Sequence, residues 1–357
     1  MRSLYVVGGQ QRQARKLLAP ASWYDYGKGL VLRVDLDSGE VETCLEYVSP
    51  PEVRAAGEPP ILFKCATLEG DRLYVCTHSE VLVYAVPSFE RVGYVTLPRF
   101  NDIHHVRPTP DGNLLVTNTG LDSVIEVTTD GRVVHEWGVL GQDPAERFPT
   151  HVDYRKIVST KPHRSHPNNT FYLDGNIWVT RFEQKDAVCL ARPEEGIPIG
   201  VERLHDGVAA GECIYFTSVK GDVVIVDAAT RHVQRIVDLT RFHPAGAILG
   251  WCRGLLVDED RVWVGFSHIR PTRFRENLGW LAKGFRWSRA THLGCYDLRA
   301  NCLVGEVELE SHGLDAVFSI FDAAPELVTQ ACHASSSARP GRNVTRTAHL
   351  EPERVTN

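Results

Sequence analysis

The chain has 357 residues, of which 43% are hydrophobic and 24% charged, with 29 glycines and 20 prolines. This length suits either two ordinary domains or one large β-type domain. Its 39 Lys and Arg against 45 Asp and Glu give a net charge of −6, which excludes a protein that binds nucleic acid over its whole surface.

The sequence indicates neither a membrane nor an export pathway. No run approaches the roughly 18 apolar residues of a membrane span, and the N-terminal segment has too few for a signal peptide. The nine cysteines are scattered and never form a CxxC pair. We therefore expect reduced thiols, a cytoplasmic location, and no membrane or nucleic-acid partner.

Short strand signals follow one another along the chain, and most come directly after a turn. Six of them are rich in β-branched or aromatic residues and lie at 4–8, 73–76, 114–117, 177–180, 214–217 and 262–265. Further strand signals follow them, as at 81–84, 123–127, 131–137, 222–227 and 292–297. Few stretches have helical periodicity, so the pattern predicts an all-β protein.

These strand signals form a repeat that predicts a single six-bladed β-propeller. Its anchor residues are separated by gaps of 69, 41, 63, 37 and 48 residues, and are Tyr5, Tyr74, Leu115, Trp178, Tyr215 and Trp263. One propeller blade takes about 40–50 residues, so the longer gaps predict inserts, one of them at about 140–166. A second insert, at 268–292, is expected in the blade that contains Trp263.

The first anchor is too near the N-terminus to have an inner strand before it. We expect that strand to come from 314–320, so that both ends of the chain close the ring. The propeller then spans 1–330. The polar segment 335–357 has no periodicity, which predicts a disordered tail.

The segment 105–131 resembles one blade of the NHL and SMP-30/gluconolactonase-like propellers. The resemblance rests on the run 110–120 (PDGNLLVTNTG), the strand 123–127 and the turn at 130–131. It implies a six-bladed fold, whose members include hydrolases, lyases and binding modules. The SMP-30 type holds its divalent metal with Glu, Asn and Asp oxygens. In this chain the corresponding positions hold His and basic residues, with Asn168 and Asn169 as the only amides.

A polar residue stands ten positions before five of the anchors, where we expect the start of each innermost strand. Inner strands converge on one axis, so residues at equal offsets should face each other around a central channel. The five are Lys64, His105, Asn168, His205 and Arg253. Neighbouring side chains on a strand point to opposite faces, so His104 is expected to pack between blades.

Three histidines from consecutive predicted blades are candidate metal ligands: His105, His166 and His205. Three imidazoles with an open position suit a catalytic Zn²⁺ or Fe²⁺, and suit Ca²⁺ less well. The peptidylglycine-amidating lyase, also a six-bladed propeller, is similar in drawing one His from each of several blades. That similarity concerns the arrangement only, and a structural role for each histidine is the alternative.

The two inserts carry basic and aromatic residues. Arg side chains favour carboxylate, phosphate or sulfate, so we expect the inserts to help bind a small anionic substrate. The candidate substrate-binding residues are Asn168, Asn169, Lys161, Arg164, Arg270 and Arg273. A short amphipathic helix with a solvated basic face is the alternative for the second insert.

The leading hypothesis is a metal-assisted propeller enzyme (a lyase, isomerase/cyclase or hydrolase) acting on a small anionic molecule. Arg253 and Lys64 would neutralise its charge, and Asp206 would orient His205 or act as a base. No Walker loop or dinucleotide GxGxxG motif occurs, so no nucleotide cofactor is expected. The alternative is a non-catalytic module that binds a partner protein or an anionic glycan. The oligomeric state is left open.

Overall fold

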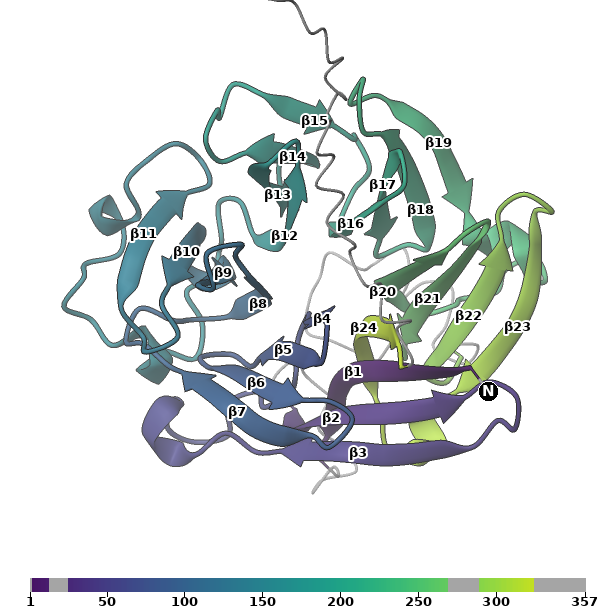
Figure 1. Cartoon of the computed structure of the whole chain (residues 1–357), viewed down its shortest axis with the longest axis horizontal. Helices are drawn as coiled ribbons and strands as arrows, with labels where there is room; N and C mark the ends of the chain where they lie inside the picture. The colour runs from purple at the N-terminus through teal and green to yellow at the C-terminus, as the bar shows by residue number, and fades with distance from the viewer. Residues whose placement is uncertain (1, 13–24, 269–288, 324–357) are drawn as a thin grey trace, which may run out of the picture. The chain divides into compact units, whose positions relative to one another are not determined.

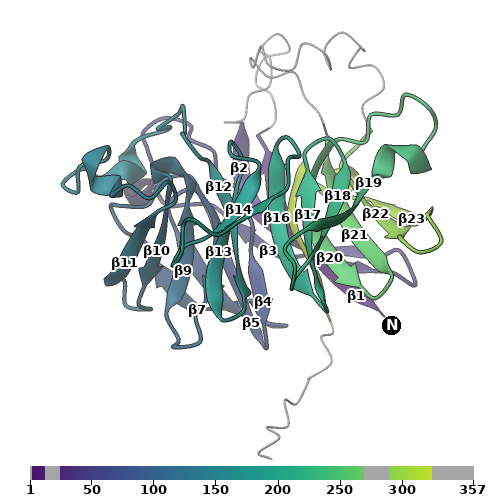
Figure 2. The ribbon, with the colours of Figure 1, turned by 90° about the horizontal axis from the view of Figure 1, so that it is seen from above.

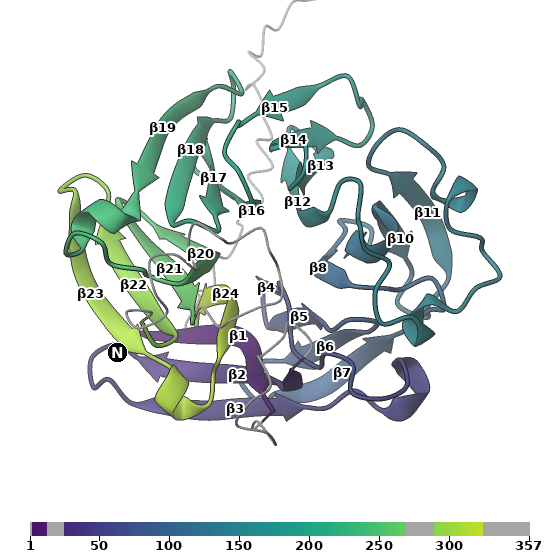
Figure 3. The same cartoon turned by 180° about the vertical axis from the view of Figure 1, so that it is seen from behind.

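Six four-stranded antiparallel sheets stand around a common centre (Figure 1). The computed structural model describes residues 2–12, 25–268 and 289–323. In every sheet one strand lies nearest the centre: β24, β4, β8, β12, β16 or β20 (Figures 1 and 3). Seen from the side, the strands β16 and β20 run across the thickness of the ring (Figure 2). The predicted all-β, six-bladed architecture is confirmed.

From the centre outward, the first sheet contains β24 (Ala316–Asp322), β1 (Ser3–Gln11), β2 (Tyr26–Asp35) and β3 (Val41–Tyr47). The second contains β4 (Thr67–Glu69), β5 (Arg72–Cys76), β6 (Val81–Ala85) and β7 (Glu90–Val95). The third contains β8 (Ile103–Pro108), β9 (Leu114–Asn118), β10 (Ser123–Val127) and β11 (Val133–Gly138).

The remaining three sheets follow the same order. The fourth contains β12 (Pro167–Leu173), β13 (Asn176–Arg181), β14 (Asp186–Cys189) and β15 (Gly196–Pro198). The fifth contains β16 (Leu204–Ala210), β17 (Cys213–Ser218), β18 (Asp222–Asp227) and β19 (Val233–Asp238). The sixth contains β20 (Trp251–Asp258), β21 (Arg261–Ser267), β22 (His292–Asp297) and β23 (Cys302–Glu308).

Helical structure in the described residues is limited to single 3-10 turns. They are η1 (Pro51–Val53), η2 (Thr119–Leu121), η3 (Pro144–Glu146), η4 (Tyr154–Lys156), η5 (Leu239–Phe242) and η8 (Glu310–His312). Two of them, η3 and η4, lie in the connection between β11 and β12, where the first insert was expected. In the described part of the chain no helix is long and apolar enough to cross a membrane. The eight cysteines found there are free thiols.

The ring closes by pairing the two ends of the propeller, as predicted. β24 runs antiparallel to β1 and supplies the inner strand of the first sheet. A Cβ atom on Gly8 would lie 1.8 Å from the carbonyl oxygen of Ala316, so the close approach of these strands requires glycine.

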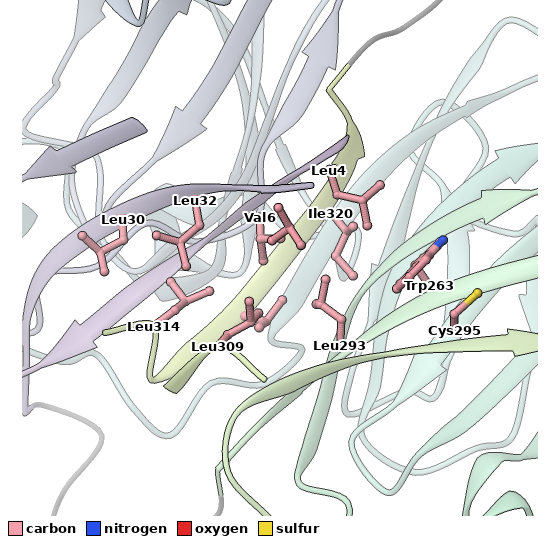
Figure 4. Close-up of a cluster of buried hydrophobic side chains, with 12 residues drawn as sticks. Leu4, Val6, Leu30, Leu32, Trp263, Leu293, Cys295, Leu309, Leu314 and Ile320 are labelled. Carbon is pink, nitrogen blue, oxygen red and sulfur yellow. The ribbon is translucent and has the colours of Figure 1, made fainter. Parts of the chain in front are cut away.

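Buried apolar side chains fill the space between the first and sixth sheets (Figure 4). Leu4 and Leu32 from the first sheet pack with Trp263 and Leu293 from the sixth, and Ile320 of β24 lies among them. Each fully buried side chain of this size contributes roughly 1.5–3 kcal/mol. This cluster therefore stabilises the closure, in addition to the hydrogen bonds between β1 and β24.

Five of the six described inner strands contain a β-bulge, where the pairing register shifts. The additional residues are His104 in β8, Asn168 in β12, Asp206 and Gly207 in β16, Gly254 in β20 and Phe318 in β24. An extra residue interrupts the strict alternation of side chains between the two faces of a strand. The bulges therefore decide which side chains reach the centre of the ring.

Candidate functional site

Two cavities lie among the inner strands in the part of the chain that the structure describes. The first, which we call the basic cavity, has about 590 Å³ of empty space, part of which is open to solvent. Most of its ionisable lining residues stand near the starts of the inner strands, whereas one, His78, follows β5. They are Lys64, His78, Asp102, His104, Lys161, His166 and Arg253. The second cavity, of about 1000 Å³, is lined further along the same strands. Its polar residues include Thr67, His105, Arg107, Asn169, Asp206 and Ser319.

Asp102 is the one carboxylate that lines the basic cavity in the described structure. The Lys64 ammonium donates a hydrogen bond to its Oδ1. Three imidazole nitrogens surround it: His104 Nε2 lies 3.5 Å and His78 Nδ1 3.8 Å from Oδ1, and His163 Nε2 lies 3.9 Å from Oδ2. Burial, the largest single effect, would raise the pKa of Asp102, but Lys64 together with His104 and His78 outweighs it and holds that pKa well below its ordinary value.

The histidines of the basic cavity are neutral at pH 7. Burial, reinforced by the Lys64 charge, lowers the pKa of both His78 and His104 to about 4. Burial and then the nearby His104 lower the pKa of His166 well below its ordinary value. The cavity therefore combines three cationic side chains and one carboxylate with uncharged imidazoles, each of which has one nitrogen able to accept a proton.

His104 is held by a residue from the next blade. Its Nδ1 lies 2.8 Å from Oδ1 of Asn168, and Nδ2 of Asn168 donates to the carbonyl of Leu204 at 2.9 Å. Both His104 and Asn168 are bulge residues of their strands. Asn168 is 1% exposed, so water does not compete for these bonds.

The loop before β12 forms one wall of the basic cavity and carries Lys161, His163 and His166. Asp122 holds this loop: its carboxylate accepts the backbone N–H groups of residues 164, 165 and 166 at 2.8, 3.0 and 2.9 Å. The guanidinium of Arg147 donates to the same carboxylate at 2.9 Å. Within the loop, Nδ1 of His163 lies 2.8 Å from Nδ1 of His166.

Arg253 lines the basic cavity from β20 and is half-buried. Its guanidinium carbon lies 5.2 Å from the ring centroid of Phe318 and 5.7 Å from that of Trp251. Aromatic faces orient a guanidinium, whose edge suits planar acceptors such as carboxylate or phosphate. Lys64 and Arg253 thus both lie where the sequence predicted them, beside one central cavity.

The predicted position of His105 in a ligand site is wrong. Thr67 donates its hydroxyl to the Val106 carbonyl, so it accepts from Nε2 of His105 at 3.1 Å. Nδ1 of His105 accepts the backbone N–H of Thr170 at 3.2 Å. Both ring nitrogens are therefore used in joining three blades. The bulge at His104 interrupts the alternation of side chains, so that His104 lines the basic cavity and His105 lines the second one.

The predicted histidine ligands are not brought together. His205 is buried with its ring against Phe182, at a centroid distance of 5.6 Å, and lines neither cavity. His166 lies in the basic cavity, but His105 lines the other one. Among the described residues, no group of three or more His, Cys, Asp or Glu is placed to hold a metal ion. These side chains do not fit the predicted metal site.

The predicted pairing of Asp206 with His205 is also wrong. Oδ2 of Asp206 accepts from the Thr217 hydroxyl and from the Gly254 N–H, and the residue lines the second cavity. Burial raises the pKa of Asp206 to about 6, although the Thr217 and Gly254 bonds and the Arg253 charge oppose this.

The predicted substrate-binding residues fall in different places. Lys161 lines the basic cavity, Asn169 lines the second cavity, and Arg164 lies beside a surface hollow near Arg147. Asn168 contacts His104 without lining either cavity. Arg270 and Arg273 lie outside the described residues, as does the predicted tail 335–357.

Sequence reasoning missed three features of the basic cavity: Asp102, His78 and the orientation of His104. His104 and His105 were considered as neighbours on a strand, but a single Asp beside adjacent histidines gave no signal of its own. His78 follows the strand β5 and lacks any motif.

Six sheets in a closed ring around central cavities define a six-bladed β-propeller. No protein-family model and no curated protein matches the sequence. Among solved structures, the chain is similar to a protein of unknown function from Bacteroides caccae. The two are 12% identical with a TM-score of 0.55, over 90% of this chain and 98% of that one.

The chain is also similar, more weakly, to a streptogramin B lyase and to the C-terminal WD40 domain of Sif2. Both are 11% identical to this chain. The lyase has a TM-score of 0.46 over 90% of this chain and 95% of that one. The WD40 domain has a TM-score of 0.44, over 83% and 81%. At sequence identities this low, structural similarity shows a shared fold and nothing more. The NHL or SMP-30/gluconolactonase type therefore stays a prediction.

Proposed function

We propose that this propeller is an enzyme that binds a small anionic molecule in the basic cavity and removes a proton from it. The observation that carries the proposal is the composition of the cavity wall. Lys64, Lys161 and Arg253 face one carboxylate, Asp102, with a neutral His104 beside it. A ligand that carries a carboxylate or phosphate suits a wall with three cationic side chains.

His104 is the proposed base. It lines the cavity and is uncharged at pH 7, so one ring nitrogen is free to take a proton from the ligand. The resulting imidazolium would stand beside the Asp102 carboxylate, 3.5 Å from Nε2, which favours the charged form. Removal of a proton next to an anionic group is the first step of many lyase and isomerase or cyclase reactions.

Binding of anions tests the first half of the proposal. Inorganic phosphate, sulfate and succinate are titrated into the protein by calorimetry at low and high salt. We expect at least one to bind, more weakly at high salt, and Arg253→Met to weaken it about tenfold or more. Arg107→Met is the matched control, because Arg107 is half-buried like Arg253 but lines the second cavity. Absence of binding by all three anions, or equal loss in both variants, contradicts the proposal.

Exchange of hydrogen with solvent tests the second half. The protein is incubated in D₂O with a mixture of small carboxylates and phosphate esters, and deuterium uptake is measured by mass spectrometry. At least one compound should take up deuterium, and His104→Gln should slow the exchange by about 100-fold or more. His135→Gln, on the exposed face of β11, serves as the control. Exchange that survives His104→Gln would exclude His104 as the base.

The predicted metal is left out of this mechanism, because its three predicted ligands do not converge. Elemental analysis of the purified protein tests that prediction directly. The alternative of a binding module rested on the basic insert around Arg270 and Arg273, which lies outside the described residues.

A further inference from the structure

We infer that Asn168 is a positioning residue that keeps a proton on Nδ1 of His104 and leaves Nε2 bare toward the basic cavity. The inference rests on the proposed function in so far as His104 is the base there. It concerns how that base is prepared: a residue on β12 selects the tautomer of a histidine on β8.

The first step fixes the orientation of the Asn168 amide. Its Nδ2 lies 2.9 Å from the backbone carbonyl of Leu204. A carbonyl oxygen only accepts, so the atom that faces it must be the NH₂ group. The amide oxygen Oδ1 is therefore the atom that faces His104, at 2.8 Å from Nδ1.

The second step assigns the proton of His104. An amide oxygen carries no hydrogen, so the short contact requires that Nδ1 donates. A neutral imidazole has one N–H, which leaves Nε2 with its lone pair. Nε2 lies 3.5 Å from Oδ1 of Asp102, a longer contact than that of Nδ1 with Asn168, and Lys64 already donates to that oxygen.

The third step shows why this contact is not replaced by solvent. His104 is 9% exposed and Asn168 only 1%. Both are additional residues in their bulges, so neither continues the regular alternation of its strand. The two bulges bring the side chains together between neighbouring blades. Asn168 was predicted to contact substrate, but its amide is fully used between Leu204 and His104.

The test reads the tautomer in the ligand-free protein. Histidine is labelled with ¹⁵N, and long-range ¹H–¹⁵N correlations at pH 7 report which ring nitrogen is protonated. The resonances of His104 are identified by their loss in His104→Gln. We expect a protonated Nδ1 and a bare Nε2 in the wild type, and a shift toward protonated Nε2 in Asn168→Leu.

Two further variants separate tautomer selection from a structural role. Asn168→Asp keeps an oxygen acceptor opposite Nδ1 and should retain the wild-type tautomer. Asn169→Leu changes the next residue, which lines the second cavity, and should leave His104 unaffected. In the deuterium-exchange assay, Asn168→Leu should slow the exchange by about 100-fold or more, whereas Asn168→Asp should retain most of the wild-type rate.

The outcomes distinguish this inference from the proposed function. The inference is overturned if His104 of the wild type is protonated on Nε2, or if its tautomer is the same in Asn168→Leu. The wild-type measurement decides the question even if Asn168→Leu does not fold. If the expected tautomers are found but no compound takes up deuterium, the positioning role of Asn168 is supported and the proposed function is refuted.

Discussion

Replacement of Asp206 by Asn is expected to stabilise the propeller at neutral pH. The carboxylate is 5% exposed, and both of its hydrogen bonds, from Thr217 and Gly254, end on Oδ2. The amide oxygen of the new side chain, placed where Oδ2 lies, would accept the same two bonds. Asp206 has φ of +59°, a left-handed conformation that Asn tolerates better than most residues. The substitution therefore removes the charge with little other change.

The size and sign of the effect follow from the pKa. Burial raises it from 3.8 in the unfolded chain to about 6 in the folded protein, although Arg253 opposes the shift. Between these values the folded state holds a proton that the unfolded chain has lost, so stability falls as the pH rises. The loss is complete above about pH 6. Two pKa units correspond to about 3 kcal/mol.

Urea unfolding of wild type and Asp206→Asn between pH 4 and 7.5 measures this contribution. The free energy of unfolding of the variant, minus that of the wild type, should rise by about 2–2.5 kcal/mol across the range, because pH 4 already lies just above the unfolded pKa. Asp222→Asn is the control, since Asp222 also accepts a hydroxyl hydrogen bond, from Ser218, but is partly exposed. A difference that stays constant, or falls with rising pH, would refute the reasoning.

Three other substitutions probe the site and the closure. Asp102→Asn leaves the buried Lys64 ammonium without its carboxylate and should destabilise the fold by about 3–5 kcal/mol in urea unfolding, with Lys64→Met restoring part of the loss. Asp122→Ala removes the acceptor of three backbone N–H groups, so hydrogen exchange of the amides 164–166 should accelerate while that of β22 stays unchanged. Gly8→Ala places a Cβ 1.8 Å from a carbonyl oxygen of β24, and the melting temperature should fall by several degrees; an unchanged value would mean that the closure tolerates a side chain there.

Local sequence patterns were enough to predict the architecture. Strand signals such as 73–76 and 262–265 became β5 and β21, because β-branched and aromatic residues after a turn favour extended chain wherever they stand. The lack of an inner strand before Tyr5 was enough to predict closure by the C-terminal part, and β24 occupies that place.

Only part of the candidate site could be predicted from the sequence. Lys64 and Arg253 were expected beside a central cavity and lie there. The exchange of His105 for His104 arose because the prediction assumed a regular strand. One additional residue in β8 places His104 beside the basic cavity and His105 beside the second one, and the local composition does not indicate this bulge.

Repeated turns and apolar strands encode the ring, since each blade depends mainly on residues close in sequence. The chemistry at its centre depends on contacts between blades: Lys64 with Asp102, His104 with Asn168, and Asp122 with the loop before β12. These partners are tens of residues apart, and a bulge of a single residue decides which of them meet. The sequence alone thus determined the propeller and its closure, while tertiary packing selected the ionisable groups that share the cavity.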